Sequence, residues 1–317
     1  MSSSLDPIDP DRPVHHVIIG AGPVGRAVAD HLVEGGTTPT LVTRSGTAFV
    51  GTNARTADMS DPIAAKHALA DADIVHQCSQ PEYHRWPEEF PPLQAGIADA
   101  ATAAGARLVV IDNLYGYGAV DGPITEDLPA MATGRKGRTR ATMWQDLVRR
   151  HEAGDLAVVA ARASDFYGPH TLGSSYGERL FARLVAGKAA DVVGDPTTRH
   201  SVTYVPDVGA AMVRLALSGD AWGRAWHVPN APAVTGEEFV ALAAVEAGTS
   251  ARVSAIGATK LRLAGIFIPA ARETIEMLHE FDRDFVVDHS AYADQFGDDH
   301  TPLSSGIAST VHWYQNR

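Results

Sequence analysis

A glycine-rich turn near the N-terminus has the residue types and spacing that a bound pyrophosphate requires. The turn consists of Gly20, Ala21, Gly22, Pro23, Val24 and Gly25. In a G-x-G-x-x-G turn the first glycine permits a tight bend. The second lets the backbone approach the phosphates, and the third lets the following helix pack closely on the strand. Because the turn follows the apolar run Val14–Ile19 and opens a helical pattern, we expect a dinucleotide site here and not a turn that serves packing alone.

The end of the second expected strand indicates which dinucleotide is bound. A carboxylate at this place would bind the ribose 2′-hydroxyl of NAD, whereas this strand ends with Thr43, Arg44 and Ser45. A guanidinium and a hydroxyl suit a 2′-phosphate through charge and bidentate hydrogen bonding. The sequence therefore favours NADP as cofactor. NAD is the alternative, with Arg44 then an exposed loop residue.

Further cofactor contacts are expected after later strands, since ligands of parallel α/β sheets bind at the carboxyl ends of strands. Asp58 and Met59 follow the third expected strand and are predicted to meet the adenine ring. Cys78, Ser79 and Gln80 end the fourth. Cys78 by itself is more typical of a small buried residue than of a reactive thiol.

Two aromatic segments follow the fourth and fifth strands. Tyr83, His84 and Trp86 belong to a polar and aromatic segment that is suited either to lining a substrate cleft or to forming a plain surface loop. Tyr115 and Tyr117 come directly after the fifth strand, where a phenol could contribute a proton or simply pack. We predict substrate contacts for Tyr83, His84, Trp86 and Tyr117, and a catalytic role for Tyr115.

The elements that position these residues alternate between short apolar runs and helical patterns. Strands are expected at Val14–Ile19, Thr40–Thr43, Ile74–Gln77, Leu108–Ile111 and Leu156–Ala161. Helices with recognisable ends are expected at Pro23–Glu34, from Asp61-Pro62, at Gln94–Ala104 and at Thr139–Ala153. This alternation predicts an α/β fold with a Rossmann-type, doubly wound parallel sheet.

In the later part of the chain the regular alternation of strands and helices ends, which predicts a smaller substrate-binding region. We expect a flexible tail over residues 1–12, a dinucleotide-binding domain over 13–163 and a mainly substrate-binding region over 164–317. Residues 200–228 are expected to return to the sheet. The other expected elements are strands at Ser201–Val205 and Ala225–Val228 and helices at Glu178–Ala186, after the capping box Thr235–Glu238, and at Ala270–Phe281.

Several motifs together resemble the extended short-chain dehydrogenase/reductase family, which includes NAD(P)-dependent epimerases and dehydratases. They are the glycine turn, Tyr117-Gly118, Arg162–Pro169, Tyr204–Val208, Trp226–Pro229, Thr301–Leu303 and Trp313-Tyr314. The resemblance implies a Rossmann fold, a nicotinamide dinucleotide and a cofactor contact at Ser164. It also implies a homodimer through the helices that begin near Gln94 and Thr139.

The catalytic positions depart from the family pattern and indicate an atypical branch. By the resemblance, Asn113 stands where the family has Ser or Thr, Lys136 where it has the catalytic Tyr, and Arg140 where it has Lys. A lysine with an arginine four residues later is also similar to isoflavone-reductase-type enzymes, in which the lysine serves. Lys136 and Arg140 would share one helical face, and positive neighbours lower a lysine pKa. We therefore expect Lys136 to act as general acid and touch the cofactor, Asn113 to orient the substrate oxygen and Arg140 to tune the lysine. The alternative is a solvated basic helix start.

Two further departures concern the substrate. Asp165 replaces the Asn of the family, and His200 stands where many nucleotide-sugar enzymes have an arginine. Both are expected to contact substrate. Because a carboxylate repels a pyrophosphate, these changes disfavour a nucleotide-sugar substrate.

Composition excludes several other classes of function. The chain has 317 residues, with 26 Lys and Arg against 38 Asp and Glu, a net charge of −12. This balance argues against a nucleic-acid or anionic-membrane partner. Cys78 is the only cysteine, which excludes an internal disulfide. No apolar run is long enough to span a bilayer, and the scattered histidines match no metal motif, so we expect a cytoplasmic protein without a metal.

The sequence thus favours an NADP-dependent oxidoreductase that acts on a small organic carbonyl or alcohol. A related alternative is an epimerase or dehydratase that uses the bound nicotinamide transiently. An alternative from another class is a non-catalytic NAD(P)-binding sensor, which the missing tyrosine permits.

Overall fold

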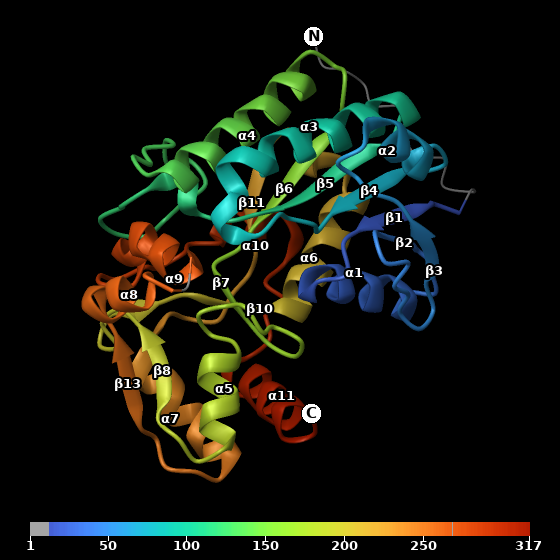
Figure 1. Cartoon of the computed structure of the whole chain (residues 1–317). Coiled ribbons are helices and arrows are strands. Elements are labelled where there is room, and N and C mark those ends of the chain that lie inside the picture. The colour runs from blue at the N-terminus through green and yellow to red at the C-terminus, as the bar shows by residue number, and fades with distance from the viewer. Residues whose placement is uncertain (1–12, 268) are drawn as a thin grey trace. The chain divides into compact units, whose positions relative to one another are not determined.

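The computed structural model describes residues 13–267 and 269–317, so the expected tail at 1–12 lies outside the described residues (Figure 1). The chain forms two compact units. The first contains residues up to Gly116, Arg135–Arg162 and Val208–Trp226, and the second contains Tyr117–Gly134, Ala163–Asp207 and His227–Arg317. A single boundary between residues 163 and 164 was expected. Two segments lie on the other side of it: residues 117–134 belong to the second unit, and residues 208–226 belong to the first.

The first unit is built on a seven-stranded sheet with the strand order β11-β6-β5-β4-β1-β2-β3. The strands are β1 (His16–Ile19), β2 (Thr40–Thr43), β3 (Asn53–Thr56), β4 (Ile74–Gln77), β5 (Arg107–Asp112), β6 (Val158–Arg162) and β11 (Ala225–His227). All pairings from β3 to β6 are parallel. The strand order reverses between β1 and β4, where doubly wound sheets bind their ligands. The predicted Rossmann-type fold is confirmed.

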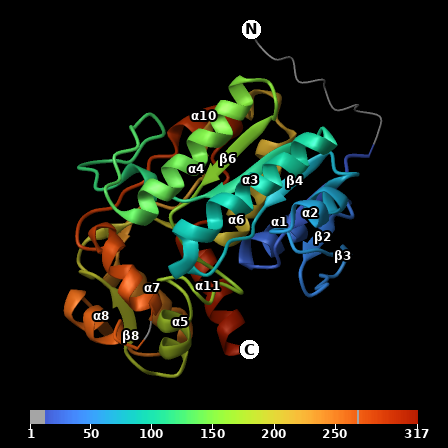
Figure 2. The ribbon, with the colours of Figure 1, turned by 45° about the horizontal axis from the view of Figure 1, so that its top comes forward.

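Helices cover both faces of this sheet. They are α1 (Pro23–Glu34), α2 (Pro62–Leu69), α3 (Trp86–Ala104), α4 (Arg135–Glu152) and α6 (Val205–Leu217). Figures 1 and 2 show α2, α3 and α4 side by side on one face, with α1 and α6 on the other. A core of Val, Leu, Ile and Ala side chains lies between the sheet and the first group of helices. This burial on two faces explains why the central strands are mostly apolar, whereas the edge strand β3, with the sequence Asn-Ala-Arg-Thr, is largely exposed.

Capping residues set several helix ends where the sequence predicts them. The Asp61 carboxylate accepts hydrogen bonds from the Ile63 and Ala64 N–H groups at 2.9 and 3.4 Å, and Pro62 is the first residue of α2. Gly105, with a φ of +67°, ends α3 in the left-handed conformation that glycine favours. Helix starts and stops can thus be predicted where they depend on local side chains.

Two helix starts were predicted too late. Helix α3 begins at Trp86 and not Gln94, although it contains Pro91 and Pro92, and α4 begins at Arg135 and not Thr139. The N–H groups of the first helical turn have no partner within a helix, so prolines near the start cost few hydrogen bonds. Burial of Trp86 and Phe90 offsets that loss.

The second unit contains three two-stranded sheets. They pair β7 (Asp165–Tyr167) with β10 (Val202–Tyr204), β8 (Ala190–Val193) with β13 (Val253–Ile256), and β9 (Arg199–His200) with β12 (Val234–Thr235). The expected return of residues 200–228 to the main sheet is therefore wrong for β10. Only β11 joins that sheet.

Helices surround an aromatic core in the second unit. They are α5 (Glu178–Val185), α7 (Gly236–Ala247), α8 (Ala258–Ala264), α9 (Pro269–Thr274), α10 (Ser290–Phe296) and α11 (Leu303–Gln315). The core includes Tyr167, Phe181, Phe239 and Ile307. The capping box of α7 forms as predicted, with Thr235 and Glu238 each bonding the other's backbone N–H. The helix predicted over Ala270–Phe281 divides into α9 and a 3-10 segment, Ile275–Glu280. Within the described residues, no helix is long and apolar enough to cross a membrane.

Candidate functional site

The glycine turn joins β1 to α1 and bends sharply at Gly20, which has a φ of +103°. The Gly20 N–H donates to the Val42 carbonyl at 3.0 Å, and a Cβ at Gly20 would lie 3.0 Å from the backbone of Ser79. Both the left-handed conformation and the close backbone approach require glycine here. The turn is therefore fixed against the ends of β2 and β4.

Gly22 and Gly25 have opposite surroundings. A Cβ at Gly25 would meet the Gly20 carbonyl oxygen at 2.0 Å, whereas a Cβ at Gly22 would meet nothing within 4 Å. Gly22 is the N-cap of α1, makes no side-chain cap, and is followed by Pro23 and the buried Val24. Unpaired N–H groups and the positive end of a helix dipole favour an anion at such a terminus. The turn thus fits a pyrophosphate in front of Gly22.

A second feature that fits a ligand is the hydroxyl of Ser79. Its Oγ is buried and has no hydrogen-bond partner among the described residues. The neighbouring Cys78 N–H donates to the Ile19 carbonyl at 2.9 Å, and burial raises the pKa of the Cys78 thiol well above its usual range. Cys78 is therefore a packing residue and not a thiolate, while the exposed Gln80 follows at the rim.

The residues predicted to select the cofactor lie on exposed loops after β2 and β3. Arg44 and Ser45 are exposed, and the Ser45 hydroxyl contacts the Thr47 hydroxyl at 2.7 Å. Hydrogen bonds from the Ser60 N–H and hydroxyl, with a contribution from the Arg44 charge, lower the pKa of Asp58. Met59 is buried in the core, so only Asp58 of that pair presents an exposed side chain.

Lys136 is fully buried on the first turn of α4, with 0% of its surface exposed. Its Nζ lies 4.6 Å from the centre of the Tyr83 ring. The Tyr83 hydroxyl contacts the Tyr115 hydroxyl at 3.3 Å, and Trp86 packs edge-on against Tyr83 at 5.1 Å between ring centres. Three aromatic candidates thus form one cluster with the buried Lys136, which contacts it through Tyr83. A solvated basic helix start describes Arg135 and Arg138, which are exposed, but not Lys136.

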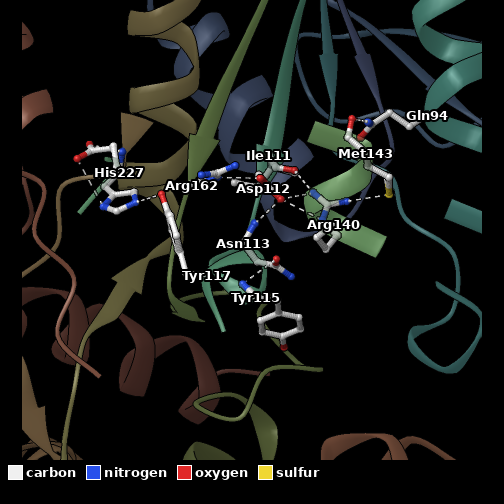
Figure 3. Close-up of polar contacts among 11 residues, drawn as sticks. Gln94, Ile111, Asp112, Asn113, Tyr115, Tyr117, Arg140, Met143, Arg162 and His227 are labelled. Carbon is white, nitrogen blue, oxygen red and sulfur yellow. Dashed lines mark hydrogen bonds and ion pairs between the residues drawn. The ribbon is translucent and has the colours of Figure 1, made fainter. Parts of the chain in front are cut away.

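Arg140 lies one turn after Lys136 and binds a carboxylate that the sequence analysis missed. Its Nε and Nη2 donate to Asp112 Oδ1 at 3.0 and 2.5 Å, and Arg162 Nε donates to Asp112 Oδ2 at 2.9 Å (Figure 3). Burial alone would raise the pKa of Asp112, but the two guanidinium groups outweigh it and hold that pKa below its usual value.

Arg140 is therefore one partner of a buried ion pair. Asp112 compensates its charge, and Glu88 compensates that of Arg135 at 2.6 Å; the tuning role expected for Arg140 stays a prediction. Asp112 could have been found in the sequence as a carboxylate that ends an apolar strand beside a candidate residue.

Asn113 follows Asp112 at the carboxyl end of β5. Its N–H donates to Asp112 Oδ1 at 2.8 Å, and its side-chain oxygen accepts from the Tyr115 N–H at 3.3 Å. These contacts orient the side chain and leave its amide N–H groups as the donors. Asn113 can therefore donate to an oxygen, as a hydroxyl in that position would.

In the second unit, Tyr117 is buried and paired with His227. The Tyr117 hydroxyl lies 2.9 Å from His227 Nε2, and His227 Nδ1 lies 2.7 Å from the Asp288 carbonyl. Because a carbonyl can only accept, Nδ1 carries the hydrogen and Nε2 accepts from Tyr117. Glu126 accepts from the His227 N–H at 2.9 Å. The Tyr117 hydroxyl is thus held in a buried contact with His227, and its substrate contact stays a prediction.

Asp165 and His200, both predicted to contact substrate, contact each other. His200 Nε2 lies 3.0 Å from Asp165 Oδ2, and Nδ1 lies 3.2 Å from the Glu280 carbonyl. The imidazole is stacked between Phe281 and Phe285. The Glu280 side chain is 2% exposed, and its Oε1 has no partner in the described part of the chain. Burial and then the charge of Asp165 raise the pKa of Glu280, so this buried carboxyl favours its neutral form.

Two remaining candidates make contacts within the protein. Ser164 is buried, its N–H donates to Thr203 Oγ1 at 3.1 Å and its hydroxyl donates to the Ser201 carbonyl at 2.5 Å. Its hydroxyl hydrogen is thereby used, and the cofactor contact of Ser164 stays a prediction. His84 is exposed and lies 3.6 Å from Glu82.

Comparison with solved structures shows the same fold at low sequence identity. dTDP-glucose 4,6-dehydratase DesIV from Streptomyces venezuelae, solved with NAD, has a TM-score of 0.77 and 17% identity, covering 96% of this chain and 98% of that one. UDP-glucose 4-epimerase from Thermotoga maritima has a TM-score of 0.77, 15% identity and coverages of 96% and 99%. UDP-N-acetylglucosamine 4-epimerase from Bacillus cereus has a TM-score of 0.74 and 15% identity, covering 94% of this chain and 96% of that one.

A family model supplies the remaining comparison, since no curated protein sequence matches the chain. The model of the NAD dependent epimerase/dehydratase family matches residues 17–228. This range contains the glycine turn, the Asp112 cluster and Lys136, and it is more than half of the chain. The chain is therefore a member of the NAD-dependent epimerase/dehydratase family of enzymes.

Proposed function

We propose that this enzyme is an NADP-dependent oxidoreductase of an atypical kind that acts on a small organic carbonyl or alcohol. The main support for this proposal is that Lys136 is completely buried in a cluster with Tyr83 and Tyr115, in the same unit as the glycine turn. A buried ammonium must be stabilised or lose its proton. Lys136 therefore takes the proton-transfer role of the missing tyrosine.

In the proposed mechanism the chain's own residues bind, orient and protonate. A nicotinamide dinucleotide, when bound, supplies or accepts a hydride at the substrate carbon. The glycine turn and the Ser79 hydroxyl would hold its phosphates. During reduction Lys136 gives a proton to the substrate oxygen, which Asn113 holds through its amide N–H groups, and during oxidation the proton returns. Tyr83, Trp86 and Tyr115 exclude water around the lysine.

A small substrate is favoured by the Asp165–His200 pair. Sugar-nucleotide enzymes must bind a diphosphate, and the Asp165 carboxylate disfavours one. The second candidate is an epimerase or dehydratase, which is favoured by the family and by solved neighbours that are UDP-sugar epimerases and a dTDP-glucose dehydratase. A sensor without turnover is the third candidate, because the family's catalytic tyrosine is absent.

The assignment of Lys136 is tested by substitution after a substrate has been found by following NADPH oxidation. Lys136→Met keeps the bulk and removes the proton, so turnover should fall about 10²–10⁴-fold while NADP affinity stays nearly constant. Lys136→Arg should not restore activity, since a guanidinium hardly releases a proton. Arg138→Met, an exposed neighbour on the same helix, is the matched control. Near-normal turnover of Lys136→Met would move the acid to Tyr115.

Cofactor choice is tested at Arg44. A lost charge-assisted phosphate contact costs about 1.5–3 kcal/mol, so Arg44→Ala should weaken NADP binding about tenfold or more and barely change NAD binding. Calorimetry with both cofactors measures this, with the exposed Arg149→Ala as control. Equal loss for both cofactors, or no loss, would make NAD the better assignment.

Two broader expectations are also proposed. The acidic net charge of −12 supports a small-molecule substrate and no nucleic-acid partner. A cytoplasmic location and a homodimer through α3 and α4 rest on the composition and on the family resemblance.

A further inference from the structure

Three side chains that could ligate a metal meet in the second unit, and none of them is a residue used above for catalysis. His289 Nε2 lies 3.2 Å from Asp298 Oδ1, and His300 Nδ1 lies 2.7 Å from the same oxygen. The three ligand atoms all lie within 4.8 Å of one another. His289 and His300 are half-buried, and only Asp298 has an exposed side chain. The group has the composition of a two-histidine, one-carboxylate metal site.

The backbone holds these residues in place from both sides. His289 precedes α10, and Gly297, with a φ of +97°, ends that helix and turns the chain back. Beyond the cluster, the Thr301 N–H and hydroxyl donate to Asp207 at 2.8 and 2.6 Å. Before it, the Asp288 carbonyl accepts from His227 at 2.7 Å. Because both ends are anchored, the ligands are arranged by the fold and not by their own contacts alone.

A buried amide orients the first histidine. Asn230 is 4% exposed, and its side-chain amide lies 3.4 Å from His289 Nδ1. With Nδ1 directed to the amide, Nε2 is directed to Asp298 and becomes the ligand atom. The Asn230 Nδ2 also donates to the Val228 carbonyl at 3.3 Å, so the amide nitrogen faces His289 and the amide holds the plane of that imidazole.

We infer that His289, Asp298 and His300 form a binding site for one Zn²⁺ ion, with water completing the coordination. Two imidazoles and a carboxylate suit zinc, whereas Mg²⁺ and Ca²⁺ prefer oxygen ligands. Zinc–ligand bonds of about 2.0–2.1 Å place tetrahedral ligand atoms roughly 3.3 Å apart. The observed separations from Asp298 are 3.2 and 2.7 Å, so an ion enters after small side-chain shifts.

The sequence pattern did not reveal this site, and the expectation of no metal followed from that. The two histidines are separated by a whole helix and a turn, which matches none of the short metal motifs. Bound zinc would tie the start of α10 to the segment that follows it. We therefore expect the ion to stabilise the second unit against unfolding.

The experiment uses the full-length chain, freed of metal with a chelator and titrated with ZnCl2 by calorimetry and thermal unfolding. Wild type should bind one Zn²⁺ per chain, and its melting temperature should rise when zinc is bound. Asp298→Asn and His300→Gln should each weaken zinc binding at least tenfold and abolish the zinc-dependent rise in melting temperature. The matched controls are Asp294→Asn on α10 and His312→Gln on α11, both exposed, and they should behave as wild type.

Several results would overturn the site. One is the absence of stoichiometric zinc binding by wild type, and another is equal weakening in the controls and in the two ligand variants. MgCl2 should give no shift in melting temperature. Circular dichroism of each variant verifies its fold before titration. Anomalous diffraction from zinc-loaded crystals gives an independent readout, since a peak away from His289, Asp298 and His300 would also refute the assignment.

Discussion

At the scale of single residues, three glycines in one turn serve three physical purposes. Gly20 adopts a left-handed conformation, Gly25 allows contact with the Gly20 carbonyl, and Gly22 keeps the space before α1 open. All three positions hold the same residue type, but their surroundings differ. Substitutions at these positions should therefore have different consequences.

We expect Gly22→Val to abolish dinucleotide binding while the fold survives. The added side chain would occupy the place of the pyrophosphate, and the stability cost should be about 1 kcal/mol because valine is a poor N-cap. Gly25→Val is the contrasting variant, since its Cβ would overlap a backbone oxygen at 2.0 Å and should destabilise the whole unit. Calorimetry with NADP and urea unfolding measure both effects. Unchanged NADP affinity in a folded Gly22→Val protein would refute the cofactor site.

At the scale of elements, neighbouring strands β1 and β4 bury a pair of histidines. His16 Nδ1 lies 3.0 Å from His76 Nε2, and the rings stack at 5.3 Å between centres. Burial, and then the charge of His15, lowers the pKa of His16 to about 4, and burial also lowers the pKa of His76. Both strands therefore pack correctly only with neutral imidazoles.

This pair should make stability depend on pH in the mildly acidic range. An unfolded histidine takes up a proton near pH 6.5 and the folded His16 only near pH 4, so stability is complete above 6.5 and falls as pH decreases. For one such group the loss between pH 7 and pH 5 is about 2 kcal/mol. Urea unfolding of His16→Gln should show a loss smaller by about this amount. Parallel curves for the variant and wild type would contradict the assignment, and the exposed His312→Gln is the control.

At the scale of the whole molecule, the cofactor unit is completed by a distant part of the chain. The Ala160 N–H donates to the Arg224 carbonyl at 3.2 Å, and the Gly223 N–H donates to the Val158 carbonyl at 2.7 Å. Gly209 of α6 lies so close to α1 that a Cβ would be 2.4 Å from the backbone of Ala27. The edge of the sheet and one face of α1 are therefore covered by residues 208–226.

A fragment of residues 1–163 should consequently fail to form a stable cofactor domain. Without β11 and α6 it would expose the edge of β6 and apolar surface of α1, which favours aggregation. Circular dichroism, urea unfolding and light scattering should show a less cooperative and more aggregated protein than the intact chain. Co-expression with a peptide of residues 205–228 should partly restore it. A fragment that unfolds as cooperatively as the intact chain would disprove this dependence.

The sequence by itself determined the elements of the fold that depend on local chemistry. The five predicted strands of the sheet are found with boundaries shifted by two residues at most, because a strand buried on both faces is mostly apolar along its length. Asp61, Gly105 and the Thr235–Glu238 capping box mark helix ends, since each satisfies neighbouring backbone groups. The glycine turn was recognisable for the same reason.

Only the tertiary structure decided which side chains form ion pairs and hydrogen bonds with one another. Asp112 compensates Arg140, His200 pairs with Asp165, and Lys136 is buried under Tyr83. Each pairing joins residues from separate elements, and a side chain's charge or proton is set by its nearest partner and not by its neighbours in sequence. The same reason hid the histidine pair of β1 and β4, which residue spacing cannot reveal because pairing between strands is fixed by the register of the folded sheet.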